Sequence, residues 1–73
     1  MHDRTKELIE IMGDYSLSAP DVARILGRTP ATVRIWRCRN STRIIPAHAL
    51  ELLRAHLELE TMRADAAMAR RAA

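Results

Sequence analysis

The stretch SAPDVARILGRTPATVRIWRCR, residues 18–39, decides how this 73-residue chain folds. It opens with a helix-start signal, because the Ser18 hydroxyl can accept a hydrogen bond from the amide of Asp21 while the Asp21 carboxylate reaches back to the Ser18 amide. Gly27 then supplies the residue type that most easily takes the positive φ with which many helices end. The pattern predicts a helix over residues 19–26.

A second helix starts two residues after that glycine, with Thr29 as N-cap and Pro30 in the first helical position. Two helices separated by so short a turn are expected to cross steeply. At about 100° per residue, Val33 and Trp36 share the core side with Asn40, a residue suited to a left-handed C-cap. The outward side holds Ala31, Ile35 and Cys38, flanked by Arg34 and Arg39.

Helices are also predicted on both sides of this central stretch. Asp3 is the expected N-cap of a first helix that stops at Gly13. Pro46 opens a last helix, over about 46–70, that contains no further breaker. Because aromatic residues make up only 3% of the chain and the apolar residues are mostly aliphatic, an all-α, four-helix fold in a single domain over 1–73 is expected.

The last helix has more apolar surface than one small domain needs. Leu50, Leu53 and Leu57 form a stripe that can close the domain's own core. A second stripe beside it consists of Ala49, Leu52, His56, Leu59 and Met62. A second stripe of this width needs another surface, most simply a second copy of the chain. We therefore predict a homodimer interface at Leu52, His56, Leu59 and Met62.

Positive charge is concentrated on the central part of the chain. Residues 18–48 contain six arginines against one acid, Asp21, a net charge of +5, whereas the whole chain has a net charge of +3. Arginine matches phosphate groups and guanine edges with two parallel hydrogen bonds. Small outward residues between arginines suit close approach to a duplex groove, so double-stranded DNA is the expected partner.

The residues VAxxLGxTPxTVxxW, from Val22 to Trp36, resemble the helix-turn-helix family of phage and bacterial regulators similar to lambda repressor and Cro. The chain length and the helix after the IIP segment also resemble small autorepressors encoded beside phage anti-CRISPR genes. The family resemblance implies base contacts early in the second helix of the motif, and phosphate contacts at the start of the first and in the following loop. Carried onto this chain, the family's base-reading positions are Pro30, Ala31, Arg34 and Ile35. The base-reading set predicted for this chain is Ala31, Thr32, Arg34, Ile35 and Arg39, and the predicted backbone-contacting set is Ser18, Ala19, Thr29, Ser41, Thr42 and Arg43.

This sequence departs from the family pattern at several positions. Arg28 follows the turn glycine, where an apolar residue is common, and Ala19 stands where glutamine often begins the first helix of the motif. Pro30 and Ala31 cannot read bases through polar side-chain atoms. Direct readout is therefore expected to depend on Arg34 and Arg39, with Ile35 against a thymine methyl group, together with DNA shape and dimer spacing.

The resemblance and the charge together imply a dimeric repressor of its own phage or bacterial operon, binding an inverted repeat. An antitoxin-like protein, whose last helix binds a protein partner, is the alternative. An enzyme is not expected, because no catalytic pair or glycine-rich phosphate loop is present. No cofactor, metal or small-molecule ligand is expected either, since His48 and His56 lie eight residues apart on one helix and Cys38 lies elsewhere.

The single cysteine, the charged N-terminal sequence and the short apolar runs predict a cytoplasmic protein with no membrane span. Trp36 could in principle stack on single-stranded bases, but its position on the Val33 side favours a place in the core.

Overall fold

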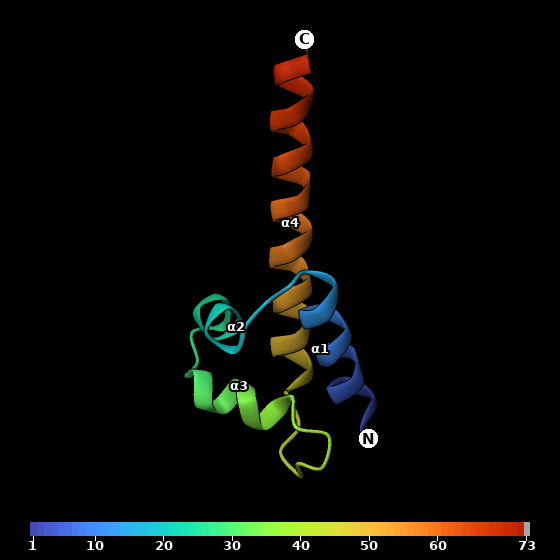
Figure 1. Ribbon diagram of the computed structural model, residues 1–73, viewed down its shortest axis with the longest axis vertical. Coiled ribbons are helices and arrows are strands. Elements are labelled where there is room, and N and C mark those ends of the chain that lie inside the picture. The colour runs from blue at the N-terminus through green and yellow to red at the C-terminus, as the bar shows by residue number, and fades with distance from the viewer. Residues whose placement is uncertain (73) are drawn as a thin grey trace.

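The computed structural model describes the backbone of residues 1–72 and the side chains of residues 1–70. Within that part of the chain the fold consists of helices alone, which confirms the predicted all-α class. The four helices are α1 (Asp3–Asp14), α2 (Ala19–Leu26), α3 (Pro30–Trp36) and α4 (Ala47–Ala72). In Figure 1, α1, α2 and α3 gather around the first half of α4, and the second half of α4 extends well beyond them. The molecule is accordingly elongated, measuring 50 × 21 × 20 Å.

The buried apolar residues form one cluster to which all four helices contribute. Its members are Leu8, Met12, Ala19, Val22, Ala23, Val33, Trp36, Ile45, Ala49, Leu50, Leu53 and Leu57. The predicted inner stripe Leu50, Leu53 and Leu57 is therefore confirmed, as is the core position of Trp36. Ala49 was expected on the outer stripe but is only 3% exposed. It lies one turn before Leu53, so it faces the core with that residue.

The first helix differs from the expectation at both ends. His2 is the N-cap, because its Nδ1 atom accepts a hydrogen bond of 3.0 Å from the Arg4 amide, and Asp3 is already helical. Gly13 does not stop the helix, which continues to Asp14. Ser16, with a φ of 52°, takes the left-handed conformation instead. Hydrogen bonds from the Ser16 amide to the Gly13 carbonyl and from the Leu17 amide to the Met12 carbonyl complete this helix end, the pattern of a Schellman motif.

The central stretch begins as predicted. The Asp21 amide donates to the Ser18 hydroxyl at 3.3 Å, and the Ser18 amide donates to the Asp21 carboxylate at 2.9 Å, which forms the capping box of α2. Gly27 ends α2 with a φ of 66°. Thr29 caps α3, since its Oγ1 atom accepts a hydrogen bond of 3.2 Å from the Thr32 amide. In Figure 1, α2 is seen nearly end-on while α3 lies across the view, so the two helices are far from parallel.

The third helix is shorter than expected. It ends at Trp36, Arg37 is its C-cap, and residues 38–46 form a linker. Asn40 was expected on the core side as a C-cap, but it lies in the linker and is exposed. The helix ends early because the core-facing residues stop at Trp36, and the polar residues that follow offer nothing to bury.

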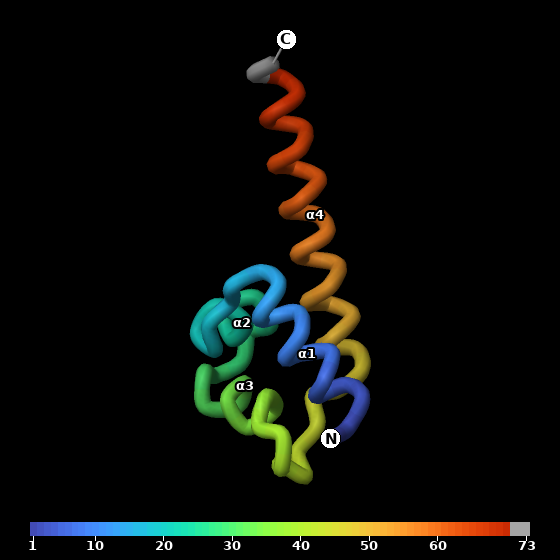
Figure 2. Tube along the Cα trace, turned by 45° about the vertical axis from the view of Figure 1, so that its right-hand side comes forward, coloured from blue at the N-terminus to red at the C-terminus, as the bar shows by residue number. Residues whose placement is uncertain are grey.

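Contacts between residues far apart in the sequence attach α4, and the end of the linker that precedes it, to α1. The Arg54 guanidinium lies 2.7 Å from the Glu7 carboxylate, which joins α4 to α1. The Arg4 side chain donates a hydrogen bond of 2.9 Å to the Ile45 carbonyl just before α4 begins. Figure 2 shows α1 alongside the first half of α4, as these contacts require. Among the helices of the described residues, none has a stretch both long and apolar enough to cross a membrane.

Candidate nucleic-acid interface

The third helix is held by one side and exposed on the other. Val33 is fully buried and Trp36 is 7% exposed, so these two side chains fix α3 against the core. Ala31 and Arg34 are exposed on the other side, and Ile35 is 37% exposed although it is apolar. An exposed helix side with a small residue, an arginine and an isoleucine is shaped for close contact with a partner surface.

Two other residues predicted to read bases are placed differently. The Thr32 side chain is half-buried, and its Oγ1 atom lies 2.9 Å from Oγ1 of Thr29, so this hydroxyl belongs to the cap of α3. Arg39 was expected beside the outward side of the helix. Because α3 ends at Trp36, Arg39 lies instead in the linker, where it is exposed.

The residues predicted to contact the DNA backbone fall into two groups. Ser18 and Thr29 use their hydroxyl oxygens as acceptors in the helix caps, and Ala19 is 3% exposed, which leaves only its backbone for a contact. The linker residues Ser41, Thr42 and Arg43 lie nearer to solvent. The Ser41 hydroxyl accepts a hydrogen bond of 3.0 Å from the Arg43 amide, which shapes the linker and leaves the Arg43 side chain exposed.

Among the described residues, the arginines of residues 18–48 lack acidic partners, with one exception. Arg24 lies 3.3 Å from the Asp21 carboxylate. The other five are all exposed, and none has an ion-pair partner among the residues the structure describes: Arg28, Arg34, Arg37, Arg39 and Arg43. A run of uncompensated guanidinium groups around one exposed helix favours binding of a polyanion.

Arg28 has a role that sequence reasoning missed. Its guanidinium carbon lies 5.9 Å from the centre of the Trp36 ring, within the range of a cation–π contact. The turn after Gly27 therefore covers the tryptophan with a charged side chain where an apolar residue would be common. The contact joins the turn to the end of α3, and no periodic pattern in the sequence indicates it.

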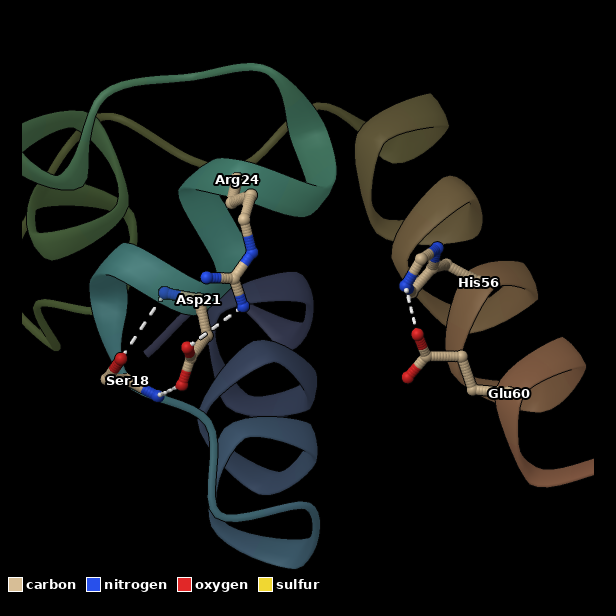
Figure 3. Close-up of polar contacts among 5 residues, drawn as sticks. All are labelled: Ser18, Asp21, Arg24, His56 and Glu60. Carbon is tan, nitrogen blue, oxygen red and sulfur yellow. Dashed lines mark hydrogen bonds and ion pairs between the residues drawn. The ribbon is translucent and has the colours of Figure 1, made fainter. Parts of the chain in front are cut away.

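The one acid of the central stretch is engaged at the start of α2. The Ser18 backbone amide, and then the Ser18 side chain and the Arg24 charge, hold the pKa of Asp21 below its ordinary value of 3.8. Figure 3 shows the Asp21 carboxylate between Ser18 and Arg24. Asp21 is thus used for helix capping and for pairing with Arg24, and the remaining arginines keep their charge uncompensated.

The residues predicted to form a dimer interface are available on α4. Leu52 is 54% exposed, Met62 is 61% exposed, and Leu59 is also exposed. His56 is half-buried, and its Nε2 atom lies 3.1 Å from the Glu60 carboxylate of the same helix, as Figure 3 shows. Within the described residues, no three His, Cys, Asp or Glu side chains gather closely enough to hold a metal ion.

Comparison of the chain with protein-family models, with curated proteins and with solved structures yields no match. Its function is therefore inferred from its own residues and their arrangement.

Proposed function

We propose that the chain is a sequence-specific regulator that binds double-stranded DNA through α3, with α2, the turn and α3 acting as a helix-turn-helix unit. The observation that supports this most is the group of five exposed arginines that have no acidic partner in the described part of the chain, a group that begins at the turn before α3 and ends in the linker after it. Neutralising phosphates with arginine releases counterions and supplies a large share of the affinity for DNA.

Within that proposal, the exposed residues have separate tasks. Arg34 reads a guanine edge from α3, and Ile35 contacts a thymine methyl group, because both lie on the exposed side of the helix. Arg39, Thr42 and Arg43 extend from the linker and contact phosphates. Contacts at phosphates fix the position of the protein on the duplex, whereas contacts at base edges discriminate between sequences.

The chain acts as a homodimer joined through the exposed side of α4, with one α3 in each half-site of an inverted repeat. Half-sites for two such helices lie about one helical turn, roughly 34 Å, apart or at a multiple of that spacing. Bound at a promoter in the cytoplasm of a bacterium, the dimer represses transcription by blocking the polymerase, and its own phage or bacterial operon is the proposed target.

A gel-shift experiment tests this function. The probe is a duplex from upstream of the chain's own coding sequence, and the control is the same duplex with one arm of its inverted repeat scrambled. A shift of the native probe at a tenfold or more lower protein concentration than the scrambled probe is expected. Equal affinity for both probes, or no shift of either, would refute sequence-specific binding.

The exposed second half of α4 also favours a second candidate, an antitoxin-like protein that binds a protein partner along that helix. This candidate does not require specific recognition of duplex DNA. It is distinguished by the same gel shift, since it predicts equal and weak binding to the native and scrambled probes.

A further inference from the structure

The other helices cover only one side of α4. Ile11 of α1 and Tyr15, which follows that helix, line a depression with Arg54, Thr61 and, at its rim, Glu58 and Met62 of α4. Leu17, which precedes α2, and Ile25 of α2 line another with His56 and Glu60. Both depressions lie beside the buried Leu57. The opposite side of α4 is left open to solvent.

A seam of apolar residues runs along this open side. Its members follow one another at alternating spacings of three and four residues, and all of them are exposed: Leu52, Ala55, Leu59, Met62, Ala66 and Ala69. This spacing is the seven-residue repeat of helices that pair along their length as a coiled coil. Three of the first four seam residues are large, with Ala55 as the exception, and the last two are alanines, so the two helices of a pair would approach most closely toward the C-terminal end.

The two edges of the seam have opposite charge. One edge is acidic and consists of Glu51, Glu58 and Asp65, seven residues apart. The other edge is basic and consists of His56, Arg63 and Arg70, also seven residues apart. All six residues flank the seam positions directly, where charges decide partner choice and orientation in coiled coils.

We propose that α4 pairs with α4 of a second copy as a parallel, in-register coiled coil along this seam, an inference that rests on the proposed dimeric function and defines its geometry. In a parallel pair, each acidic edge faces the basic edge of the other helix, five residues further along. Glu58 then faces Arg63 of the second copy, and Asp65 faces Arg70. In an antiparallel pair, acids would face acids and arginines would face arginines, and each such contact is unfavourable.

Of the three basic residues, His56 contributes least to the orientation of the pair. It is already 3.1 Å from Glu60 in its own helix, and it has a charge only when protonated. The orientation of the pair therefore depends mainly on the two arginine contacts.

The second half of α4 needs such a partner for its own stability. Every described side chain from Glu58 to Arg70 is exposed, and only Glu58, Thr61 and Met62 lie beside residues of another segment, Ile11 and Tyr15, so tertiary packing gives this part of the helix little support within one chain. An isolated helix shorter than about 12–15 residues is marginal in water. Pairing along the seam supplies packing to this segment while leaving the contacts of the first half with α1 and α2 unchanged.

Parallel pairing also places both copies of α3 at the same end of the dimer. In Figure 1, α3 lies near the beginning of α4, at the end of the molecule opposite the C-terminus. A two-fold axis along paired α4 helices brings both α3 helices to that end, where one duplex can contact them together. Antiparallel pairing would instead send the two α3 helices to opposite ends of the assembly.

Disulfide trapping tests the orientation. The native thiol is removed by Cys38→Ser, and Ala66→Cys places a new thiol on the seam. Parallel pairing brings the two new thiols within the Cα separation of about 4.4–6.8 Å that a disulfide requires. Antiparallel pairing centred between Leu59 and Met62 separates them by about 16 Å along the helix. The control is Met68→Cys in the same background, since position 68 lies away from the seam.

At micromolar protein and under mild oxidation, at least a fivefold greater disulfide-linked dimer yield is expected for Ala66→Cys than for Met68→Cys. Equal yields would overturn parallel pairing. The gel shift on native and scrambled probes is measured separately with the unmodified chain. A specific shift without trapping at position 66 refutes only the parallel pair, and trapping without a specific shift refutes only the DNA-binding function.

Charge reversal tests the edges. Glu58→Arg with Asp65→Arg makes both edges basic, and Arg63→Glu with Arg70→Glu makes both acidic. Each variant alone is expected to raise the dimer dissociation constant at least tenfold in sedimentation equilibrium, and an equal mixture of the two should recover dimers. Homodimers of either variant as tight as the unmodified chain, with helix content unchanged by circular dichroism, would overturn the assigned edges.

Discussion

Replacing the two glycines by alanine is expected to change stability in opposite directions. Gly27 has a φ of 66°, and a Cβ atom added there meets no other atom within 4 Å. The cost of Gly27→Ala is therefore the backbone cost of a left-handed L-residue alone, about 1–2 kcal/mol. Gly13 lies inside α1, and a Cβ atom added there also meets nothing within 4 Å. Gly13→Ala is expected to stabilise the fold by about 0.5–1 kcal/mol, because alanine loses less backbone entropy in a helix.

Thermal unfolding followed by circular dichroism measures both effects. For a domain of this size, 1 kcal/mol corresponds to a shift of about 4–8 °C in Tm. Gly27→Ala should lower Tm by about 4–16 °C, and Gly13→Ala should raise it by about 2–8 °C. All proteins are compared at one concentration, since dimerisation makes Tm depend on concentration. An unchanged Tm for Gly27→Ala would show that the turn before α3 is not left-handed. A lowered Tm for Gly13→Ala would show that α1 stops before that residue.

Three further substitutions test the core, the α2 cap and the DNA contacts. Trp36→Ala should cost about 3–5 kcal/mol, a large part of the total stability of so small a domain, and a loss of helical signal at 37 °C would show it, whereas an unchanged Tm would place the ring outside the core. Asp21→Ala should lower Tm at neutral pH. Because folding lowers the pKa of Asp21, its carboxylate stabilises the fold fully at pH values above its ordinary pKa of 3.8. This contribution is lost as the pH falls through the lower pKa of the folded state. The Tm difference from the unmodified chain should therefore narrow below pH 3.8, and a difference that widens there would contradict the capping role. Arg34→Ala should weaken binding to the native duplex more than binding to a random duplex. Arg43→Ala should weaken binding to both duplexes equally and make the slope of log K against log salt concentration shallower by about 1. If Arg34→Ala instead lowered the affinity for both duplexes equally, Arg34 would be a phosphate contact.

The helix starts of the central stretch could be predicted because short-range chemistry determines them. The Ser18–Asp21 capping box, the Thr29 cap and the left-handed Gly27 depend on residues within a few positions of one another. The inner stripe of α4 could be predicted for a similar reason, since helical periodicity repeats over many residues.

Where several residues can perform the same local task, sequence reasoning chose wrongly. His2 caps α1 through a ring nitrogen, although Asp3 is the more common type of cap. Ser16 takes the left-handed conformation at the end of α1, although Gly13 would do so at less cost. In this case packing helps to set the position of the helix end, because Leu17, whose amide donates to the Met12 carbonyl, packs its side chain against the core.

The exposed residues of the candidate site on α3 could be predicted, but the length of α3 and the contacts around it could not. Arg34 and Ile35 are exposed on α3 as the helical period indicates, whereas Arg39 lies in the linker because the helix stops at Trp36. The contact of Arg28 with the tryptophan ring crosses a turn, and the pairing of Glu7 with Arg54 joins residues 47 positions apart. Neither follows a local pattern.

The seam of α4 was present in the sequence but is easily overlooked. An apolar stripe chosen by residue size includes Leu52, Leu59 and Met62 and passes over the alanines between and after them. The seven-residue spacing of the acids and arginines is the clearer signal. It becomes informative once α1 and α2 are known to cover the other side of the helix.

The salt dependence of DNA binding tests the central claim most directly. The dissociation constant of the unmodified chain for its upstream duplex is measured by fluorescence anisotropy between about 50 and 200 mM salt. Each phosphate neutralised contributes about −0.9 to the slope of log K against log salt concentration. The described residues of each chain include five uncompensated arginines, so a dimer has ten; if only half of them neutralise a phosphate, the slope is already steeper than about −4, and that is the predicted lower limit. A flat dependence, or no binding to duplex at the lowest salt concentration, would contradict the proposal that α3 and its arginines bind DNA.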